Sequence, residues 1–126
     1  MRTTHRPLIF ATAASVLLSL MACEPRTAED CASDVDAMRD VIVEAVDAAG
    51  YCEEDADCAM FDPSNACEDR CAVAVNVYEV DFMSQRILDG ELNHCVAYGD
   101  DCGFTSVTCE ARVPQCNSNR CEMVAE

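Results

Sequence analysis

Hydrophobic residues form an uninterrupted run at the start of the chain. Residues 7–20 contain no charged side chain, and Arg2, His5 and Arg6 precede or flank the start of this run. As a helix the run spans about 21 Å, which is shorter than the roughly 30 Å hydrocarbon core of a bilayer. It also has no polar face, which a helix lying on a soluble core needs. A basic start and a short apolar run therefore predict a secretory signal peptide rather than a membrane-spanning helix.

The residues that close this run are Leu20, Met21, Ala22 and Cys23. They resemble the lipobox of bacterial lipoproteins, although Met21 stands where a small or β-branched residue is usual. The resemblance implies a lipoprotein signal peptide over residues 1–22, cleavage before Cys23, a thioether-linked diacylglycerol on Cys23 and a fatty acyl chain such as palmitate on its amino group. The alternative is ordinary secretion, with cleavage nearby and Cys23 paired or free.

The number of cysteines supports lipidation independently. The chain has 11 cysteines, and an unpaired thiol in an oxidising compartment is reactive. Assigning Cys23 to the lipid leaves ten, an even number that closes completely as five disulfides. The residues expected in disulfides are Cys31, Cys52, Cys58, Cys67, Cys71, Cys95, Cys102, Cys109, Cys116 and Cys121.

The charge of the mature chain indicates how it is held at a membrane. From Cys23 onward it retains six arginines and all 24 acidic residues, a formal charge of −18. Anionic lipid repels such a body, so we expect the acyl chains alone to provide the anchor. Glu24 follows Cys23, where aspartate signals retention in the inner membrane of enterobacteria, and this favours the outer membrane. We expect residues 23–30 to form an acylated tether, at most about 25 Å long, and residues 31–126 to form a disulfide-rich domain.

Apolar residues at helical spacing predict the first helix of this domain. We expect Ser33 to cap it, with acidic residues in the first turn, and Gly50 to end it. Because a helix of this length holds Cys31 and Cys52 about 25–30 Å apart, these two cysteines cannot pair with each other. The residues of the stripe are Val35, Met38, Ile42, Ala45 and Ala49.

A second helix is predicted over residues 81–89, with Asp81 as its cap and Gly90 as its end. Its inward side chains are expected to be Met83, Ile87 and Leu88.

β-forming runs predict several short strands, separated by a turn at residues 62–65. They lie at residues 59–61, 71–77 and 104–113, followed by a hairpin end at 116–121 that leads into Met123 and Val124. The order of elements predicts a small, disulfide-rich, single α+β domain with two helices and a few short antiparallel strands.

Cysteine spacing supports this fold through a second resemblance. Between Cys52 and Asn76 the chain carries Asp55-Ala56-Asp57-Cys58, Cys67-x3-Cys71 and Ala74-Val75-Asn76, and it closes with Pro114-Gln115-Cys116-Asn117-Ser118-Asn119-Arg120-Cys121. These motifs resemble a family of small cysteine-rich secreted proteins that is frequent in myxobacteria and related bacteria. Asn119 stands where that family usually has a glycine. The resemblance implies a fold and no activity.

Candidate catalytic residues are few. His94 precedes Cys95, an arrangement that invites a Cys–His nucleophile. We interpret it instead as a loop histidine beside a disulfide, because an oxidised sulfur is not a nucleophile. The chain has no lysine to activate a serine and no Gly-x-Ser-x-Gly motif. We therefore expect no enzymatic activity.

Metal and cofactor sites are not expected either. There is no Cys-x2-Cys pair, and His94 is the only histidine after Cys23, which argues against zinc. Carboxylates offer oxygen ligands for calcium, but the EF-hand glycine and bidentate glutamate are missing. We interpret these acids as a solvated surface. They are Glu53, Glu54, Asp55 and Asp57, and separately Asp100 and Asp101.

Two functional hypotheses remain, and the net charge of −16 excludes nucleic acid from both. The first is a lipid-anchored, disulfide-rich, non-catalytic interaction or structural module of the cell envelope, with an acidic surface for a basic protein partner. The alternative is a small extracytoplasmic protease inhibitor, in which Arg70, Arg112 or Arg120, each near a cysteine, enters a trypsin-like pocket.

Overall fold

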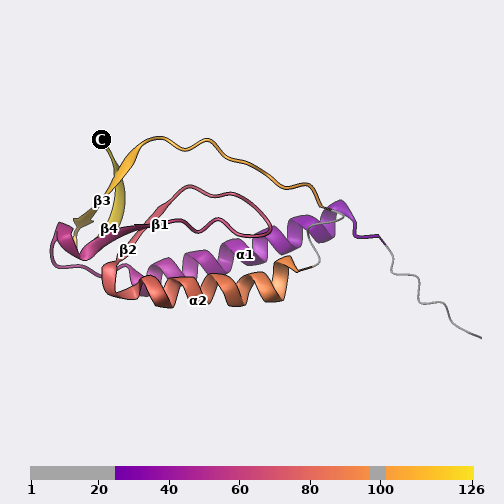
Figure 1. The fold of residues 1–126 in the computed structure, drawn as a ribbon, viewed down its shortest axis with the longest axis horizontal. Coiled ribbons are helices and arrows are strands. Elements are labelled where there is room, and N and C mark those ends of the chain that lie inside the picture. The colour runs from indigo at the N-terminus through magenta and orange to yellow at the C-terminus, as the bar shows by residue number, and fades with distance from the viewer. Residues whose placement is uncertain (1–24, 97–101) are drawn as a thin grey trace, which may run out of the picture.

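Helix α1 (Ala28–Ala49) runs along the whole domain in the computed structural model, which describes residues 25–96 and 102–126 (Figure 1). The expected signal peptide, Cys23 and Glu24 lie outside the described residues. The face of α1 that is buried carries the predicted stripe, with Met38, Ile42, Ala45 and Ala49 buried and Val35 half-buried. Gly50 ends the helix as predicted.

The start of α1 differs from the expectation. Thr27, rather than Ser33, is the cap: its side-chain oxygen accepts the N–H of Asp30 at 3.1 Å, and the Asp30 carboxylate accepts the N–H of Thr27 at 2.9 Å. This reciprocal capping box satisfies two backbone donors, whereas a single cap at Ser33 satisfies one. Residues 28–30, expected in the tether, therefore form the first turn of α1.

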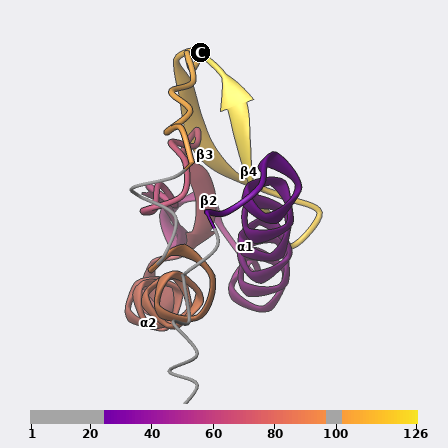
Figure 2. The same ribbon diagram turned by 90° about the vertical axis from the view of Figure 1, so that its right-hand side faces the viewer.

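Helix α2 (Val80–Gly90) packs beside α1 (Figure 2). Met83 and Ile87 are buried as predicted, but Leu88 is 49% exposed, so its inward placement was wrong. The helix begins at Val80, directly after a 3₁₀ turn, and Asp81 lies in its first turn rather than at its cap.

Helix α2 ends at Gly90 as predicted, but the chain continues directly as a π-helical turn, Glu91–Cys95. Gly90 has helical backbone angles and is buried against α1. A Cβ added at this position would lie 2.8 Å from Met38 Sδ and 3.1 Å from Val41 Cγ1. The glycine therefore permits the close approach of two helices, a tertiary reason that its sequence context does not reveal.

Two small antiparallel sheets complete the fold. Strands β1 (Cys58–Phe61) and β2 (Val73–Asn76) form one, close to the predicted positions. Strands β3 (Arg112–Asn117) and β4 (Arg120–Ala125) form the other, a hairpin that places Cys116 opposite Cys121. Its turn residues Ser118 and Asn119 both have positive φ, 52° and 62°, as a two-residue hairpin turn requires.

Residues 104–111, expected to begin a strand, form an extended strap instead. One isolated bridge joins Thr105 to Glu68, and the regular ladder begins only at Arg112. The reason is that β4 ends at Ala125, opposite Arg112, so the strap has no strand beside it. Figure 1 shows the strap in orange, crossing above the helices toward the hairpin.

Five disulfides hold these elements together, with Cα–Cα distances of 5.3–5.8 Å, and they use the ten cysteines that the sequence assigns to disulfides. One joins the start of α1 to the chain just before the strap, two fix the hairpin at the far end of α1, and two tie the segment between β1 and β2 to the π-helical turn and to the strap. The pairs are Cys31–Cys102, Cys52–Cys116, Cys58–Cys121, Cys67–Cys95 and Cys71–Cys109.

The domain is a small, disulfide-rich α+β fold with a thin core. Its buried apolar side chains fall into three small clusters rather than one, and each is completed by partly buried neighbours. Cys52 and Cys67 are fully buried, so cystine sulfur supplies part of the core. Within residues 25–96 and 102–126, none of the helices combines the length and apolarity needed to cross a membrane.

Candidate functional site

The hairpin turn is fixed to the end of α1, and together they form the end of the molecule opposite the point where the described chain begins (Figure 1). The Cys121 N–H donates to the Gly50 carbonyl at 2.7 Å, and the Cys52 N–H donates to the Asn119 carbonyl at 3.2 Å. The Asn119 side-chain amide returns a hydrogen bond to the Cys52 carbonyl at 3.1 Å. We call this region, residues 47–58, 76–79 and 116–121, the hairpin end.

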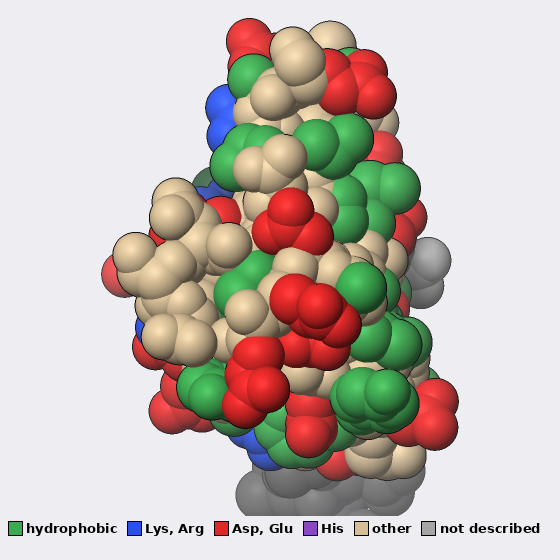
Figure 3. Space-filling model, turned by 90° about the vertical axis from the view of Figure 1, so that its left-hand side faces the viewer, with side chains coloured by type: hydrophobic (Ala, Val, Ile, Leu, Met, Phe, Trp, Pro, Cys, Tyr) green, Lys and Arg blue, Asp and Glu red, His purple; other side chains and the backbone are tan. Residues whose placement is uncertain are grey.

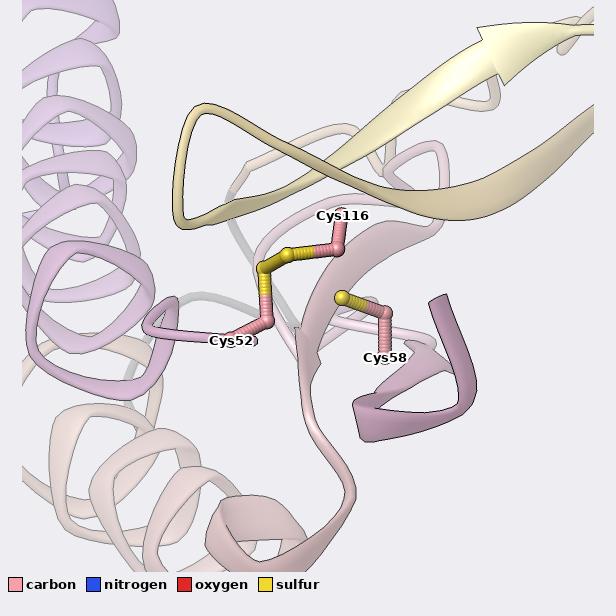
Figure 4. A group of neighbouring side chains, drawn as sticks. All are labelled: Cys52, Cys58 and Cys116. Atoms are coloured by element: carbon pink, nitrogen blue, oxygen red, sulfur yellow. A yellow bond between two sulfur atoms is a disulfide. The ribbon is translucent and has the colours of Figure 1, made fainter. Parts of the chain in front are cut away.

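The Cys52–Cys116 disulfide and the side chain of Cys58 lie close together within the hairpin end (Figure 4). The sulfur atoms of Cys52, Cys58 and Cys116 all lie within 4.8 Å of one another, a spacing suited to a metal ion. Each is already in a disulfide, Cys52 with Cys116 and Cys58 with Cys121. Zinc takes thiolate rather than disulfide sulfur, so the oxidised cluster is a crosslink and not a metal site.

The acidic loop between Cys52 and Cys58 is more than the solvated surface expected from its composition. Asp57 Oδ2 accepts the backbone N–H of Glu53 at 2.8 Å and that of Glu54 at 3.1 Å, which closes the loop. Asp55 Oδ1 accepts the N–H of Cys116 at 2.8 Å, which joins the loop to β3. Two of its four carboxylates therefore bind backbone, and the side chains of Glu53 and Glu54 are exposed. Asp100 and Asp101 lie outside the described residues.

Two exposed tyrosines belong to the hairpin end, and the hydroxyl of one of them, Tyr51, donates to Glu53 of the acidic loop at 3.5 Å. Tyr51 is 61% exposed and Tyr78 is 84% exposed. The side chain of Asn76 forms hydrogen bonds with the backbone of both tyrosines. Its amide N–H donates to the Tyr51 carbonyl at 2.8 Å, and its oxygen accepts the Tyr78 N–H at 2.9 Å. Figure 3 shows acidic side chains spread over this end of the molecule, between apolar ones. The hairpin end thus combines negative charge with aromatic rings.

The three arginines proposed for a protease pocket all form ion pairs. Arg70 Nη1 lies 3.0 Å from Glu68 and Arg112 Nη2 lies 3.4 Å from Glu110. Arg120 pairs with Asp47 of α1. Each of the three guanidiniums is therefore paired with a carboxylate of the domain.

A buried carboxylate, which the sequence did not single out, anchors the strap. The Glu68 side chain is 5% exposed and accepts from Arg39 Nε at 3.2 Å and Nη2 at 2.9 Å, besides the contact with Arg70. The adjacent Asp69 N–H donates to the Thr105 carbonyl at 3.0 Å. Since Arg39 precedes Glu68 by 29 residues, no local pattern indicates this pairing.

His94 and Cys95 are adjacent in the π-helical turn, and Cys95 is bonded to Cys67. Cys95 is buried and oxidised, while His94 is half-buried. The pair therefore contains no thiol for a nucleophile. His94 lies beside a disulfide as expected, but in a π-helical turn rather than in a loop.

A groove of about 660 Å³ separates the strap from the two sheets. Its apolar lining includes Met60 of β1, Ala72, and Met123 of β4, while Glu110 and Glu126 supply carboxylates. Met60 is 61% exposed, so the described residues leave this side chain largely uncovered.

Comparison with known proteins gives no relative: no family model matches the chain, and no curated protein or solved structure matches it significantly. Function is therefore inferred from the residues and geometry of the chain itself.

Proposed function

We propose that this protein is a lipoprotein anchored through Cys23, whose rigid acidic domain serves as a non-catalytic interaction module of the cell envelope. The observation that carries the proposal is the closure of ten cysteines as five disulfides. Five disulfides in a domain of this size indicate an oxidising, extracytoplasmic compartment. The ten cysteines of the described residues pair with one another, so they leave Cys23, which lies outside those residues, for the lipid.

The position of the hairpin end suits an anchored module. The described chain begins just before α1, and α1 has 22 residues, so it spans about 33 Å. An anchor at Cys23 therefore presents the hairpin end away from the bilayer. Glu24 after the lipidated cysteine favours the outer membrane over the inner one.

The charge of the domain defines the partner. A body of charge −18 with exposed Tyr51 and Tyr78 offers carboxylates for salt bridges and ring faces for cation–π contacts. Both suit lysine and arginine. The partner is therefore a basic envelope protein.

Lipidation is tested by labelling cells with radioactive palmitate. We expect the wild type to incorporate the label and Cys23→Ser to incorporate none. Met21→Ala, which restores the small residue usual in the lipobox, is the matched control and should retain the label. An unlabelled wild type, or a labelled Cys23→Ser variant, contradicts the proposal.

The partner is tested by capturing envelope proteins on the solubilised lipoprotein over a range of salt concentrations. We expect a basic protein that is retained at low salt and lost at high salt, because exposed charges are screened within about 10 Å at 0.1 M. No salt-sensitive partner contradicts the interaction module. Inhibition of a trypsin-like protease in a parallel panel favours the inhibitor alternative instead.

A further inference from the structure

The strap has unpaired backbone along most of its length. Residues 106–111 are all exposed, and within the described part of the chain no hydrogen bond joins their backbone to the rest of the domain. The strap is nevertheless held at two points, by the Thr105 carbonyl that accepts from Asp69 and by the Cys71–Cys109 disulfide. It is therefore an extended segment that is fixed in place without a strand beside it.

Strand β3, which follows the strap along the chain, is protected against further pairing, and the strap is not. On β3, Pro114 has no N–H to donate, and the Cys116 N–H is already accepted by Asp55. Proline and covering side chains are the usual means by which proteins block a sheet edge. Residues 106–111 contain no proline, and within the described part of the chain their backbone donors and acceptors are unpaired, which leaves them available to another chain.

The groove supplies the space that an added strand needs. Its lining includes residues of the strap, of β1 and of β4, and it reaches Arg112, where the β3–β4 ladder stops opposite Ala125. Met60, Ala72 and Met123 give it an apolar surface, on which alternate side chains of an extended peptide can pack. Strand addition of this kind derives affinity from backbone hydrogen bonds and selectivity from such side-chain positions.

Charge determines the occupant. Glu110 and Glu126 line the groove, and Arg112, the one cation among the described residues that line it, is paired with Glu110 at 3.4 Å. A second copy of the chain brings a further formal charge of −18, which opposes pairing of two straps. We propose that the groove binds an extended, basic segment of a protein partner by strand addition to the strap. This inference rests on the proposed function, since it names the binding site of the interaction module.

The binding experiment uses the full-length lipoprotein in detergent and fluorescent peptides of about ten residues. The probe alternates lysine with valine. In a second version the backbone amide nitrogens of all lysines are methylated, and in a third those of all valines. A fourth peptide alternates glutamate with valine. We expect the unmethylated lysine peptide to bind and the glutamate peptide not to bind. One methylated version should lose about tenfold in affinity, because only one edge of an added strand bonds to the strap.

Protein variants locate the peptide. Met60→Ala should weaken binding about fivefold, whereas Leu92→Ala, a matched control at 62% exposure on the π-helical turn, should leave it unchanged. Thr108→Pro removes an N–H that has no partner in the free domain, so it tests pairing at the strap with the five disulfides intact. Affinity that is insensitive to both Met60→Ala and Thr108→Pro overturns the proposal, as does equal binding of both methylated peptides.

Failure of this inference can be told apart from failure of the proposed function. A salt-sensitive envelope partner that binds Met60→Ala and Thr108→Pro as tightly as the wild type removes the groove and leaves the interaction module standing. Absence of any such partner removes the module itself. Dimerisation that Thr108→Pro abolishes makes a second copy the occupant and also overturns the basic peptide.

Discussion

Asp55 Oδ1 accepts the backbone N–H of Cys116 at 2.8 Å, although the two residues lie 61 positions apart in the sequence. The same loop carries Cys52 and Cys58, and both form disulfides to the hairpin. One hydrogen bond and two disulfides therefore join the acidic loop to the hairpin. The hydrogen bond satisfies a donor on β3 that faces away from β4. The acidic loop thus contributes to the fold as well as to surface charge.

Replacement of Asp55 should separate these two contributions. Asp55→Ala leaves the Cys116 N–H without its acceptor, and we expect the free energy of unfolding to fall by about 1–2 kcal/mol. Asp55→Asn keeps an acceptor oxygen and removes only the charge, so its loss should be less than half as large. Urea denaturation of both variants measures the difference. Equal losses mean that the charge, and not the hydrogen bond, is responsible.

Removal of the buried charge at Glu68 should loosen the strap. Glu68→Gln replaces the carboxylate by a neutral amide, which removes the ion pairs with Arg39 and Arg70, and we expect a loss of about 2–3 kcal/mol. Hydrogen exchange at the Asp69 N–H, which donates to Thr105, should become faster. The exposed Glu110→Gln is the control, and it should change the stability by less than about 0.5 kcal/mol. Similar losses in the two variants contradict the structural role of Glu68.

The cap of α1 predicts a pH dependence. Hydrogen bonds from the Thr27 backbone N–H and hydroxyl hold the pKa of Asp30 below its usual value near 3.8, and the nearby Arg26 adds to this effect. A pKa lowered by folding means that the carboxylate stabilises the fold above the unfolded value and that this stabilisation is lost as pH falls through the folded one.

An NMR titration of the Asp30 carboxyl group checks this expectation. Its midpoint should lie below 3.8 in the wild type and in Thr27→Ser, which keeps the hydroxyl. Thr27→Ala should raise it part of the way, since the backbone N–H remains. An unchanged midpoint in Thr27→Ala rules out the hydroxyl as a cause.

Local patterns predicted the helices well and their boundaries less well. The stripe that includes Met38 and Ile42 is a property of the helix alone, so spacing sufficed to find it. Gly90 has the local signature of a helix end, but its role depends on Met38 of another helix. Likewise, residues 104–111 have strand-forming composition, and whether they form a ladder depends on how far β4 extends beside them.

The candidate sites could not be predicted from the sequence because they join residues that are far apart in the chain. Ten cysteines can be counted, but their pairing joins residues 28 to 71 positions apart. Asp55 was recognised as acidic, yet its acceptor role requires the position of Cys116. The groove depends on Met60, Ala72 and Met123 from separate parts of the chain. Composition indicated the compartment and the charge, and only the fold indicated which surface remains unpaired.

The measurement that tests the central claim most directly is the intact mass of the protein purified from membranes. The account predicts a chain that begins at Cys23 and carries a diacylglycerol and a fatty acyl chain. Five disulfides should lower its mass by ten hydrogens. A mature chain with an unmodified Cys23, or with free thiols among the other ten cysteines, contradicts it.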